Sequence, residues 1–143
     1  MNNDELEQYY LNTTYSVYID ETKFDIKIGQ SVPDVIKKTL DEEKEKTAVI
    51  LTAWNPRSQL FPLLENQNRN NELKANLLNN HYTVFNAIGQ GADSSWPAEE
   101  SFFIVGITKE NAEQYATNFG QYAYVLLEID KKVSLEFSTI WYK

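Results

Sequence analysis

Alternating apolar and polar residues mark two strands near the start of the chain. Apolar side chains occupy every second position in residues 15–19 and 24–28, which places them on one face of each segment. The four residues between them, 20–23, are all polar. The pattern therefore predicts a β-hairpin.

A helix is predicted after this hairpin. Ser31 and Asp34 have the spacing of a capping box, and Val32, Val35, Ile36 and Leu40 form a short apolar stripe. The stripe gives way to a charged run, residues 41–46, which we interpret as a solvated helix end and turn.

The next elements follow the order β-α-β-β-α-β, the arrangement of a ferredoxin-like fold. They are strands over residues 47–53, 82–88, 101–107 and 122–129, a helix over 62–79, and a helix capped by Thr108 and stopped by Gly120. Residues 133–137 add a last strand. We therefore expect one α+β domain over 1–143, with an N-terminal extension at 1–46, a ferredoxin-like core at 47–129 and a C-terminal strand within 130–143.

This topology predicts that three polar segments meet at one edge of the sheet. In each β-α-β half the two strands run parallel and the helix runs back between them. The loop after residue 53, the loop over 89–100 and the helix end at 119–121 then reach the same edge. Strand ends that carry polar groups are common binding sites, so we expect the site there.

The long helix supports the same location. Leu73 and Leu77 define its inward face, and Asn66, Arg69 and Asn70 continue that stripe toward the start of the helix. Polar groups that face inward must be satisfied by protein, water or ligand. We expect these three side chains to lie beside the converging loops.

Four motifs in this region resemble a known bacterial family. They read Thr-Ala-x-Asn-Pro-x-Ser from Thr52, Glu-Asn-x-x-Arg-Asn-x-x-Leu from Glu65, Trp-x-x-Glu-Glu-Ser from Trp96 and Phe-Gly-Gln from Phe119. In this order they are similar to the family catalogued as domain of unknown function 3293. The resemblance implies a small bacterial cytoplasmic protein and supplies no activity, cofactor or substrate.

Charge and composition restrict the partners. The chain has 13 basic and 21 acidic residues, a net charge of −8, which argues against a nucleic acid or an anionic membrane as its partner. It has no cysteine, which excludes disulfides and thiolate chemistry. No apolar run reaches the length of a membrane span, and the acidic N-terminus does not resemble a signal peptide, so we expect a cytoplasmic protein.

Arg57 and Arg69 have two interpretations. They can form a fork for a phosphate or carboxylate, or they can pair with Glu99 or Glu100 in a structural network. The two glutamates are adjacent and point in opposite directions in an extended segment, so at most one is a general acid or base. They can equally be solvated surface residues.

Trp96 can stack on a ligand ring or cover the edge of the core. We expect no metal site, because His81 is the only histidine and the acidic residues lack ligand spacing, and we expect no cofactor.

The sequence favours a pocket for a small polar ligand, anionic or nucleotide-like. Its expected ligand-binding residues are Asn55, Arg57, Ser58, Asn66, Arg69, Asn70, Trp96 and Gln121, with Glu100 or Glu99 as the acid or base. The alternative is a protein-interaction or inhibitor module. In that case the polar cluster is structural, and exposed aromatic residues make the contact, namely Tyr9, Tyr10, Trp141 and Tyr142.

Overall fold

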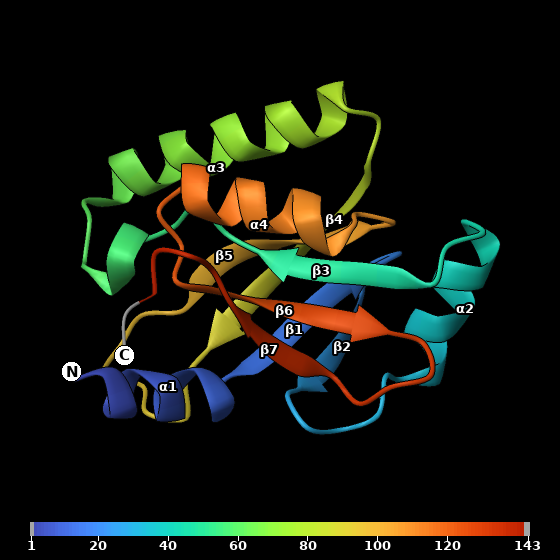
Figure 1. The fold of residues 1–143 in the computed structure, drawn as a ribbon, viewed down its shortest axis with the longest axis horizontal. Coiled ribbons are helices and arrows are strands. Elements are labelled where there is room, and N and C mark those ends of the chain that lie inside the picture. The colour runs from blue at the N-terminus through green and yellow to red at the C-terminus, as the bar shows by residue number, and fades with distance from the viewer. Residues whose placement is uncertain (1, 142–143) are drawn as a thin grey trace.

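The computed structural model describes residues 2–141, which form an α+β fold with four helices and a seven-stranded sheet (Figure 1). In chain order the elements are α1 (Asn3–Leu11), β1 (Thr14–Ile19), β2 (Thr22–Lys27), α2 (Asp34–Glu42), β3 (Thr47–Leu51), the 3₁₀ helix η1 (Pro56–Ser58), α3 (Leu63–Asn79), β4 (Thr83–Gln90), β5 (Glu99–Val105), α4 (Lys109–Asn118), β6 (Ala123–Glu128) and β7 (Ser134–Phe137).

The sheet has the strand order β2-β1-β4-β5-β3-β6-β7, and every neighbouring pair is antiparallel. β3 lies inside the sheet, where Val49 pairs with Ile104 of β5 on one side and with Leu126 of β6 on the other. This agrees with the apolar runs of β3 and β5, since strands buried on both faces carry few polar residues.

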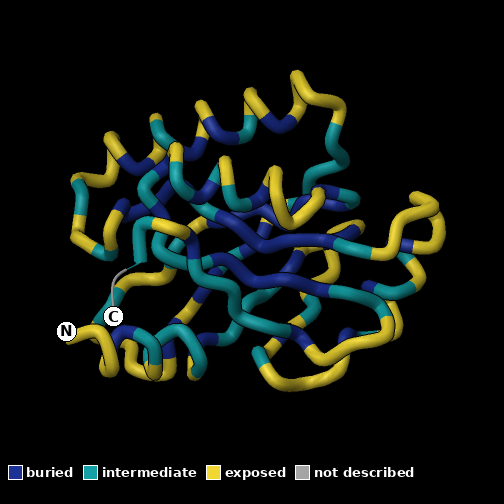
Figure 2. Tube along the Cα trace, in the orientation of Figure 1, coloured by how far each residue is buried: buried dark blue, intermediate teal, exposed yellow. Residues whose placement is uncertain are grey.

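Two apolar cores lie on opposite faces of the sheet. Buried residues run along the inner strands between them (Figure 2). On one face α3 and α4 pack together, with Leu73 and Ala116 among the fully buried residues. On the other face α2 contributes Ile36 and Leu40. α1 also lies on this second side, at the opposite end of the sheet from α2 (Figure 1).

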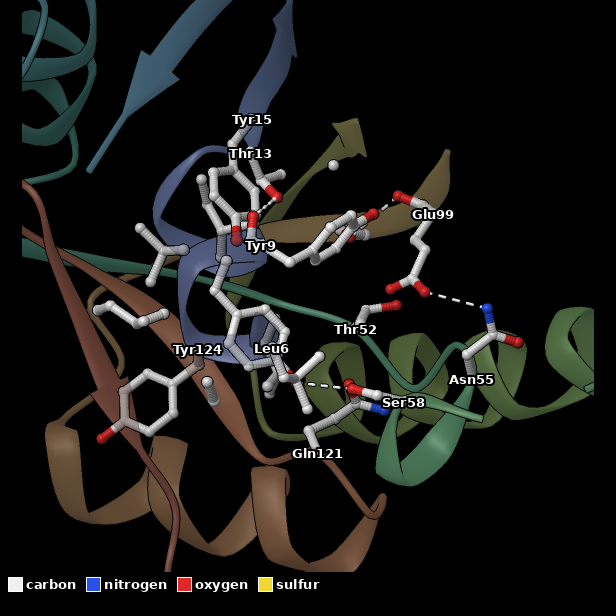
Figure 3. A pocket seen from close by; sticks show the side chains of 18 of the residues that line it. Leu6, Tyr9, Thr13, Tyr15, Thr52, Asn55, Ser58, Glu99, Gln121 and Tyr124 are labelled. Atoms are coloured by element: carbon white, nitrogen blue, oxygen red, sulfur yellow. Dashed lines mark hydrogen bonds between the residues drawn. The ribbon is translucent and has the colours of Figure 1, made fainter. Parts of the chain in front are cut away.

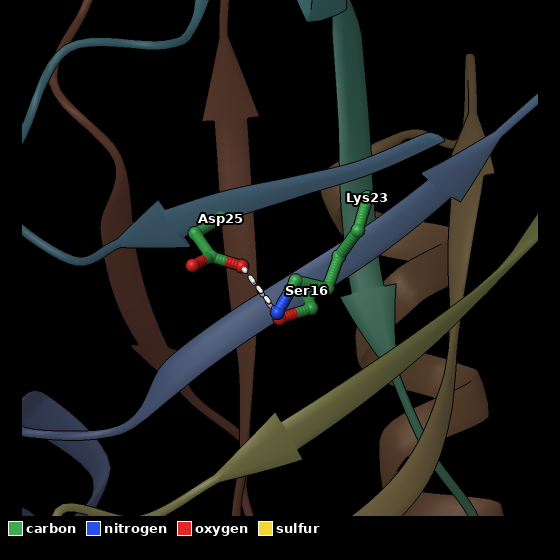
Figure 4. A network of polar contacts seen from close by, with 3 residues as sticks. All are labelled: Ser16, Lys23 and Asp25. Atoms are coloured by element: carbon green, nitrogen blue, oxygen red, sulfur yellow. Dashed lines mark hydrogen bonds and ion pairs between the residues drawn. The ribbon is translucent and has the colours of Figure 1, made fainter. Parts of the chain in front are cut away.

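The N-terminal hairpin turns more tightly than the sequence predicts. Only Asp20 and Glu21 separate β1 from β2, and both have positive φ angles, 51° and 66°, as a two-residue type I′ turn requires. On the solvent side, Asp25 accepts a 2.7 Å hydrogen bond from Ser16 Oγ and lies 3.9 Å from Lys23 Nζ (Figure 4).

The predicted capping box before α2 is wrong. The helix begins at Asp34, and its N-cap residue is Pro33, which has no side-chain cap. Ser31 instead forms an isolated β-bridge with Lys132. The bridge ties the segment before α2 to the turn before β7, so tertiary pairing replaces the local cap.

Other local signals agree with the structure. Thr108 Oγ1 accepts a 3.1 Å hydrogen bond from Asn111 N at the start of α4, and Gly120 follows the end of α4 with φ at 71°. α1, which the sequence analysis did not predict, has a real capping box, in which Asn2 Oδ1 accepts from Glu5 N at 2.8 Å.

None of the helices in residues 2–141 combines the length and the apolar character needed to cross a bilayer.

Candidate functional site

A strained turn follows β3 and carries the first residues of the site. Asn55 and Arg57 both have positive φ, 45° and 56°. Arg57 N donates to Gly120 O at 2.7 Å, and Gln121 Nε2 donates to Trp54 O at 3.1 Å. These bonds attach the turn to the segment between α4 and β6, so two of the three predicted segments meet here.

The two inward asparagines of α3 hold this turn from behind. Asn70 Oδ1 accepts from Ala53 N at 2.8 Å, and its Nδ2 donates to Glu100 O at 2.9 Å. Asn66 Oδ1 accepts from Asn55 N at 2.8 Å. Both side chains are buried. The polar stripe on the helix is therefore satisfied by backbone groups of the turn and of β5.

The arginines form neither a fork nor an ion-pair network. Arg69 donates from Nε to Ala53 O at 3.0 Å and from Nη2 to Phe119 O at 2.7 Å. The side chain of Arg57 is exposed. Across residues 2–141, the ion pairs are Lys23–Asp25, Lys109–Glu136 and Lys131–Glu128. Arg69 thus joins two loop carbonyls.

Glu99 and Glu100 lie at the start of β5 and not in the preceding loop. As expected for adjacent strand residues, they face opposite sides: Glu99 is partly buried and Glu100 is exposed. Glu99 Oε2 accepts two hydrogen bonds of 3.0 Å, from Asn55 Nδ2 and from Trp96 Nε1. Figure 3 shows the Glu99 side chain reaching from β5 toward Asn55.

Among the described residues 2–141, no basic side chain forms an ion pair with the carboxyl group of Glu99. Although part of the residue remains accessible, desolvation is the largest influence on this carboxyl group and raises its pKa. The hydrogen bonds from Trp96 and Asn55 lower the pKa again in part. Within residues 2–141, Oε1 accepts no hydrogen bond and no basic side chain pairs with Glu99.

A cavity of about 70 Å³ lies beside Glu99, between α1 and the sheet (Figure 3). Its apolar wall includes Leu6, Ile50 and Val125. Its polar lining comprises Thr13, Thr52, Asn55, Ser58, Glu99, Ser101 and Gln121, and its aromatic lining comprises Tyr9, Tyr10, Tyr15, Trp96 and Tyr124. Glu99 is the one charged residue of this lining.

Tyrosines from α1 and β1 lie close enough to Glu99 to interact with its charge. The Tyr10 hydroxyl lies 2.7 Å from Ser58 Oγ, and the Tyr9 ring packs edge-on against Trp96 with 6.3 Å between ring centroids. Burial and the nearby Glu99 raise the pKa of Tyr9 to about 12, and burial also raises the pKa of Tyr10 and Tyr15. All three phenols are therefore neutral near pH 7.

The sequence-predicted residues divide into three groups. Asn55, Ser58, Trp96, Glu99 and Gln121 line the cavity. Asn66, Arg69 and Asn70 lie behind it and hold the turn after β3, while the side chains of Arg57 and Glu100 are exposed.

Sequence reasoning missed the contribution of α1. Leu6, Tyr9, Tyr10 and Thr13 recur at helical spacing and all line the cavity. Their spacing, together with the Asn2 capping box, was the signal that could have predicted this helix.

The expectation of exposed aromatic residues is wrong for three of the four. Tyr9, Tyr10 and Trp141 are each partly buried, and Tyr10 packs against both of the others at centroid distances of 6.3 and 6.4 Å. Tyr142 lies outside the described residues. These rings belong to a cluster that fixes α1 to the sheet.

Comparison with known proteins identifies the family. No curated protein and no solved structure was found to match the chain. A family model described as "Protein of unknown function (DUF3293)" matches residues 51–124, slightly more than half of the chain. The match includes the turn after β3, all of α3, and Glu99. The chain therefore belongs to the DUF3293 family.

Proposed function

We propose that the cavity under α1 binds a small polar molecule and that Glu99 contacts it. The observation that carries the proposal is the Glu99 carboxyl group, which lines the cavity and, within residues 2–141, has two neutral hydrogen-bond donors and no basic partner. A purely structural carboxylate in such a place is costly, because burial of an uncompensated charge destabilises the fold. Groups of this kind are typical of functional sites.

The cavity size limits the ligand. Its volume of about 70 Å³ is well below the range of roughly 300–1,000 Å³ that is usual for drug-sized ligands. It holds a molecule, or the end of one, with few non-hydrogen atoms. The lining contains no lysine or arginine, so it does not favour the anionic or nucleotide-like ligand expected from the sequence.

The position of the cavity favours Glu99 over Glu100 as the residue that would transfer a proton. Its raised pKa and its position at the cavity suit a general acid or base, whereas the Glu100 side chain is exposed. We also infer that β3, β4, β5 and β6 with α3 and α4 form a ferredoxin-like unit, which the strand order β4-β5-β3-β6 supports.

Mass spectrometry of small molecules released from the purified native protein tests the proposal. We expect one small molecule in near-stoichiometric amount from the wild type and from Glu100→Gln, the matched control at the neighbouring position. Glu99→Gln should release much less of it. Equal amounts from all three proteins, or no specific molecule from the wild type, would contradict the proposal.

The alternative, a protein-interaction module, is favoured by one observation. Leu60, Leu63 and Leu64, at and just before the start of α3, are 63, 63 and 68% exposed. Apolar side chains gathered on a surface often mark a contact with another protein. In this case Leu63→Ser with Leu64→Ser should abolish retention of a specific protein in affinity purification, and Glu99→Gln should leave retention unchanged.

A further inference from the structure

We infer that the molecule held in this cavity is a small organic cation, an amine or a quaternary ammonium ion. This inference rests on the proposed function, because it assigns the ligand class of the same cavity.

The charge of the cavity is the first argument. Glu99 is the charged residue of the lining, and the lining contains no lysine, arginine or histidine. A cation therefore meets an attractive carboxylate and no like charge. The net charge of −8 over the whole chain favours the approach of a cation in addition.

The free oxygen of Glu99 is the second argument. Oε2 already accepts from Asn55 and Trp96, whereas Oε1 accepts no hydrogen bond within residues 2–141. A protonated amine would donate to this oxygen and would also bring a positive charge to the carboxylate. A quaternary ammonium ion would supply the charge but no hydrogen-bond donor. The two kinds of cation can therefore be distinguished by their binding affinities.

The aromatic wall is the third argument. Tyr9, Tyr10, Tyr15 and Trp96 all line the cavity, and Tyr9 stands at 66° to Tyr10 and at 65° to Trp96. These rings pack on one another edge to face and together supply much of the cavity lining, and aromatic rings attract cations over their faces. The Tyr10 hydroxyl is already bonded to Ser58, so this side chain offers the cavity its ring and no free phenol group.

Proton release supplies an independent readout on the wild type. A cation stabilises the ionised form of Glu99, so binding should release a proton when the pH is close to the raised pKa of this carboxyl group. Among residues 2–141, the titratable groups that interact with the charge of Glu99 are the phenols of Tyr9 and Tyr10 from α1 and of Tyr15 from β1, which remain neutral at that pH. The released proton is therefore attributable to Glu99.

Titration calorimetry with named probes tests the inference. The probes are choline, ethanolamine and 3,3-dimethylbutan-1-ol, which has the shape of choline without its charge. We expect at least one of the two cations to bind the wild type at least tenfold more tightly than the neutral alcohol. Glu99→Gln should weaken that binding at least tenfold, and Glu100→Gln should leave it unchanged. Repeating the titration at a series of pH values from 4.5 to 7, each in two buffers of different ionisation enthalpy, should show net proton release at a pH above 4.5.

The outcomes separate this inference from the proposed function. If the neutral alcohol binds as tightly as the cations, the cavity binds small molecules but the cation inference is overturned. Cation binding that survives Glu99→Gln, or that releases no proton, overturns it as well. The cation inference is also overturned if neither cation binds. The proposed function is tested separately, by the mass spectrometry of small molecules released from the native protein.

Discussion

Asn55 Nδ2 donates a 3.0 Å hydrogen bond to Glu99 Oε2, which joins the turn after β3 to the start of β5. The oxygen of the same amide, Oδ1, accepts from Phe61 N at 2.9 Å and from Asn66 Nδ2 at 2.8 Å. Two further hydrogen bonds therefore hold the amide that donates to the carboxylate. Supporting bonds of this kind hold a functional side chain in one orientation.

Glu99→Gln should stabilise the unliganded protein near pH 7. The glutamine oxygen can accept the bonds from Asn55 and Trp96, while the uncompensated charge disappears. We expect a gain of about 0.5–2 kcal/mol, the usual size of a single stabilising change. Chemical denaturation at pH 7 measures it, with Glu100→Gln as the control that should change stability by less than about 0.5 kcal/mol.

The stabilisation by Glu99→Gln should also depend on pH. Because the pKa of Glu99 is raised in the folded protein above its ordinary value of 4.5, the wild type loses stability as the pH rises through the folded-state pKa. The difference between variant and wild type should be smallest below pH 4.5 and should grow toward pH 7. If the stability difference between Glu99→Gln and the wild type shrinks as the pH rises, the prediction is wrong. A positive charge would then stabilise the ionised carboxylate of the wild type.

Asn66→Ala should destabilise the protein by about 2–4 kcal/mol. The buried Asn66 accepts from Asn55 N and donates to Asn55 Oδ1, so its removal leaves buried polar groups without partners and opens a cavity. Thermal or chemical unfolding measures the loss. Asn68→Ala, on the exposed side of the same helix, is the matched control and should change stability by less than about 0.5 kcal/mol.

Arg69→Ala should destabilise the protein by about 1–3 kcal/mol, through loss of charged donors to Ala53 O and Phe119 O. Arg69→Lys should recover only part of this loss, because one ammonium group cannot reproduce the two diverging donors. A loss above about 3 kcal/mol would point instead to an unpaired buried carboxylate, and full recovery with lysine would contradict the two-carbonyl arrangement.

Gly91→Ala should loosen the packing of α1. A methyl group on Gly91 would lie 2.8 Å from Tyr9 Cζ and 2.9 Å from Tyr9 Oη, so the ring must move. We expect a loss of about 1–3 kcal/mol. Ser94→Ala in the same loop is exposed and should have little effect. In a Tyr9→Ala background, Gly91→Ala should cost much less, and a double-mutant cycle with no coupling would show that the ring is not the obstacle.

The inner strands and the phase of α3 could be predicted because their signals are local. Leu73 and Leu77 set the inward face, and Asn66 and Asn70 followed from helical periodicity. The pairing of β1 with β4 could not be predicted, since Val17 meets Ala87 across a sequence separation that no local pattern encodes. The partners of Arg69 were missed for the same reason. They are backbone carbonyls, which every residue has, so residue types do not indicate which carbonyls accept its hydrogen bonds.

The orientation of Glu99 was within reach of the sequence. Phe103 and Ser101 share one face of β5, and the same alternation places Glu99 on it. The loop assigned to residues 89–100 hid this relationship, because it made the predicted strand begin at residue 101, whereas β5 begins at Glu99. Without α1 the cavity had no cover, so neither Tyr9 nor Tyr10 was assigned to the site.

Direct titration of the Glu99 carboxyl group by ¹³C NMR tests the central claim. Its resonance can be assigned by its absence from Glu99→Gln. We expect a pKa above the ordinary value of 4.5 in the unliganded protein, because desolvation outweighs the two hydrogen bonds and no basic side chain of residues 2–141 pairs with Glu99. A measured pKa at or below 4.5 would contradict the proposal that Glu99 is an uncompensated ligand-binding group. Solvent or a positive charge would then already stabilise the ionised carboxylate without a ligand.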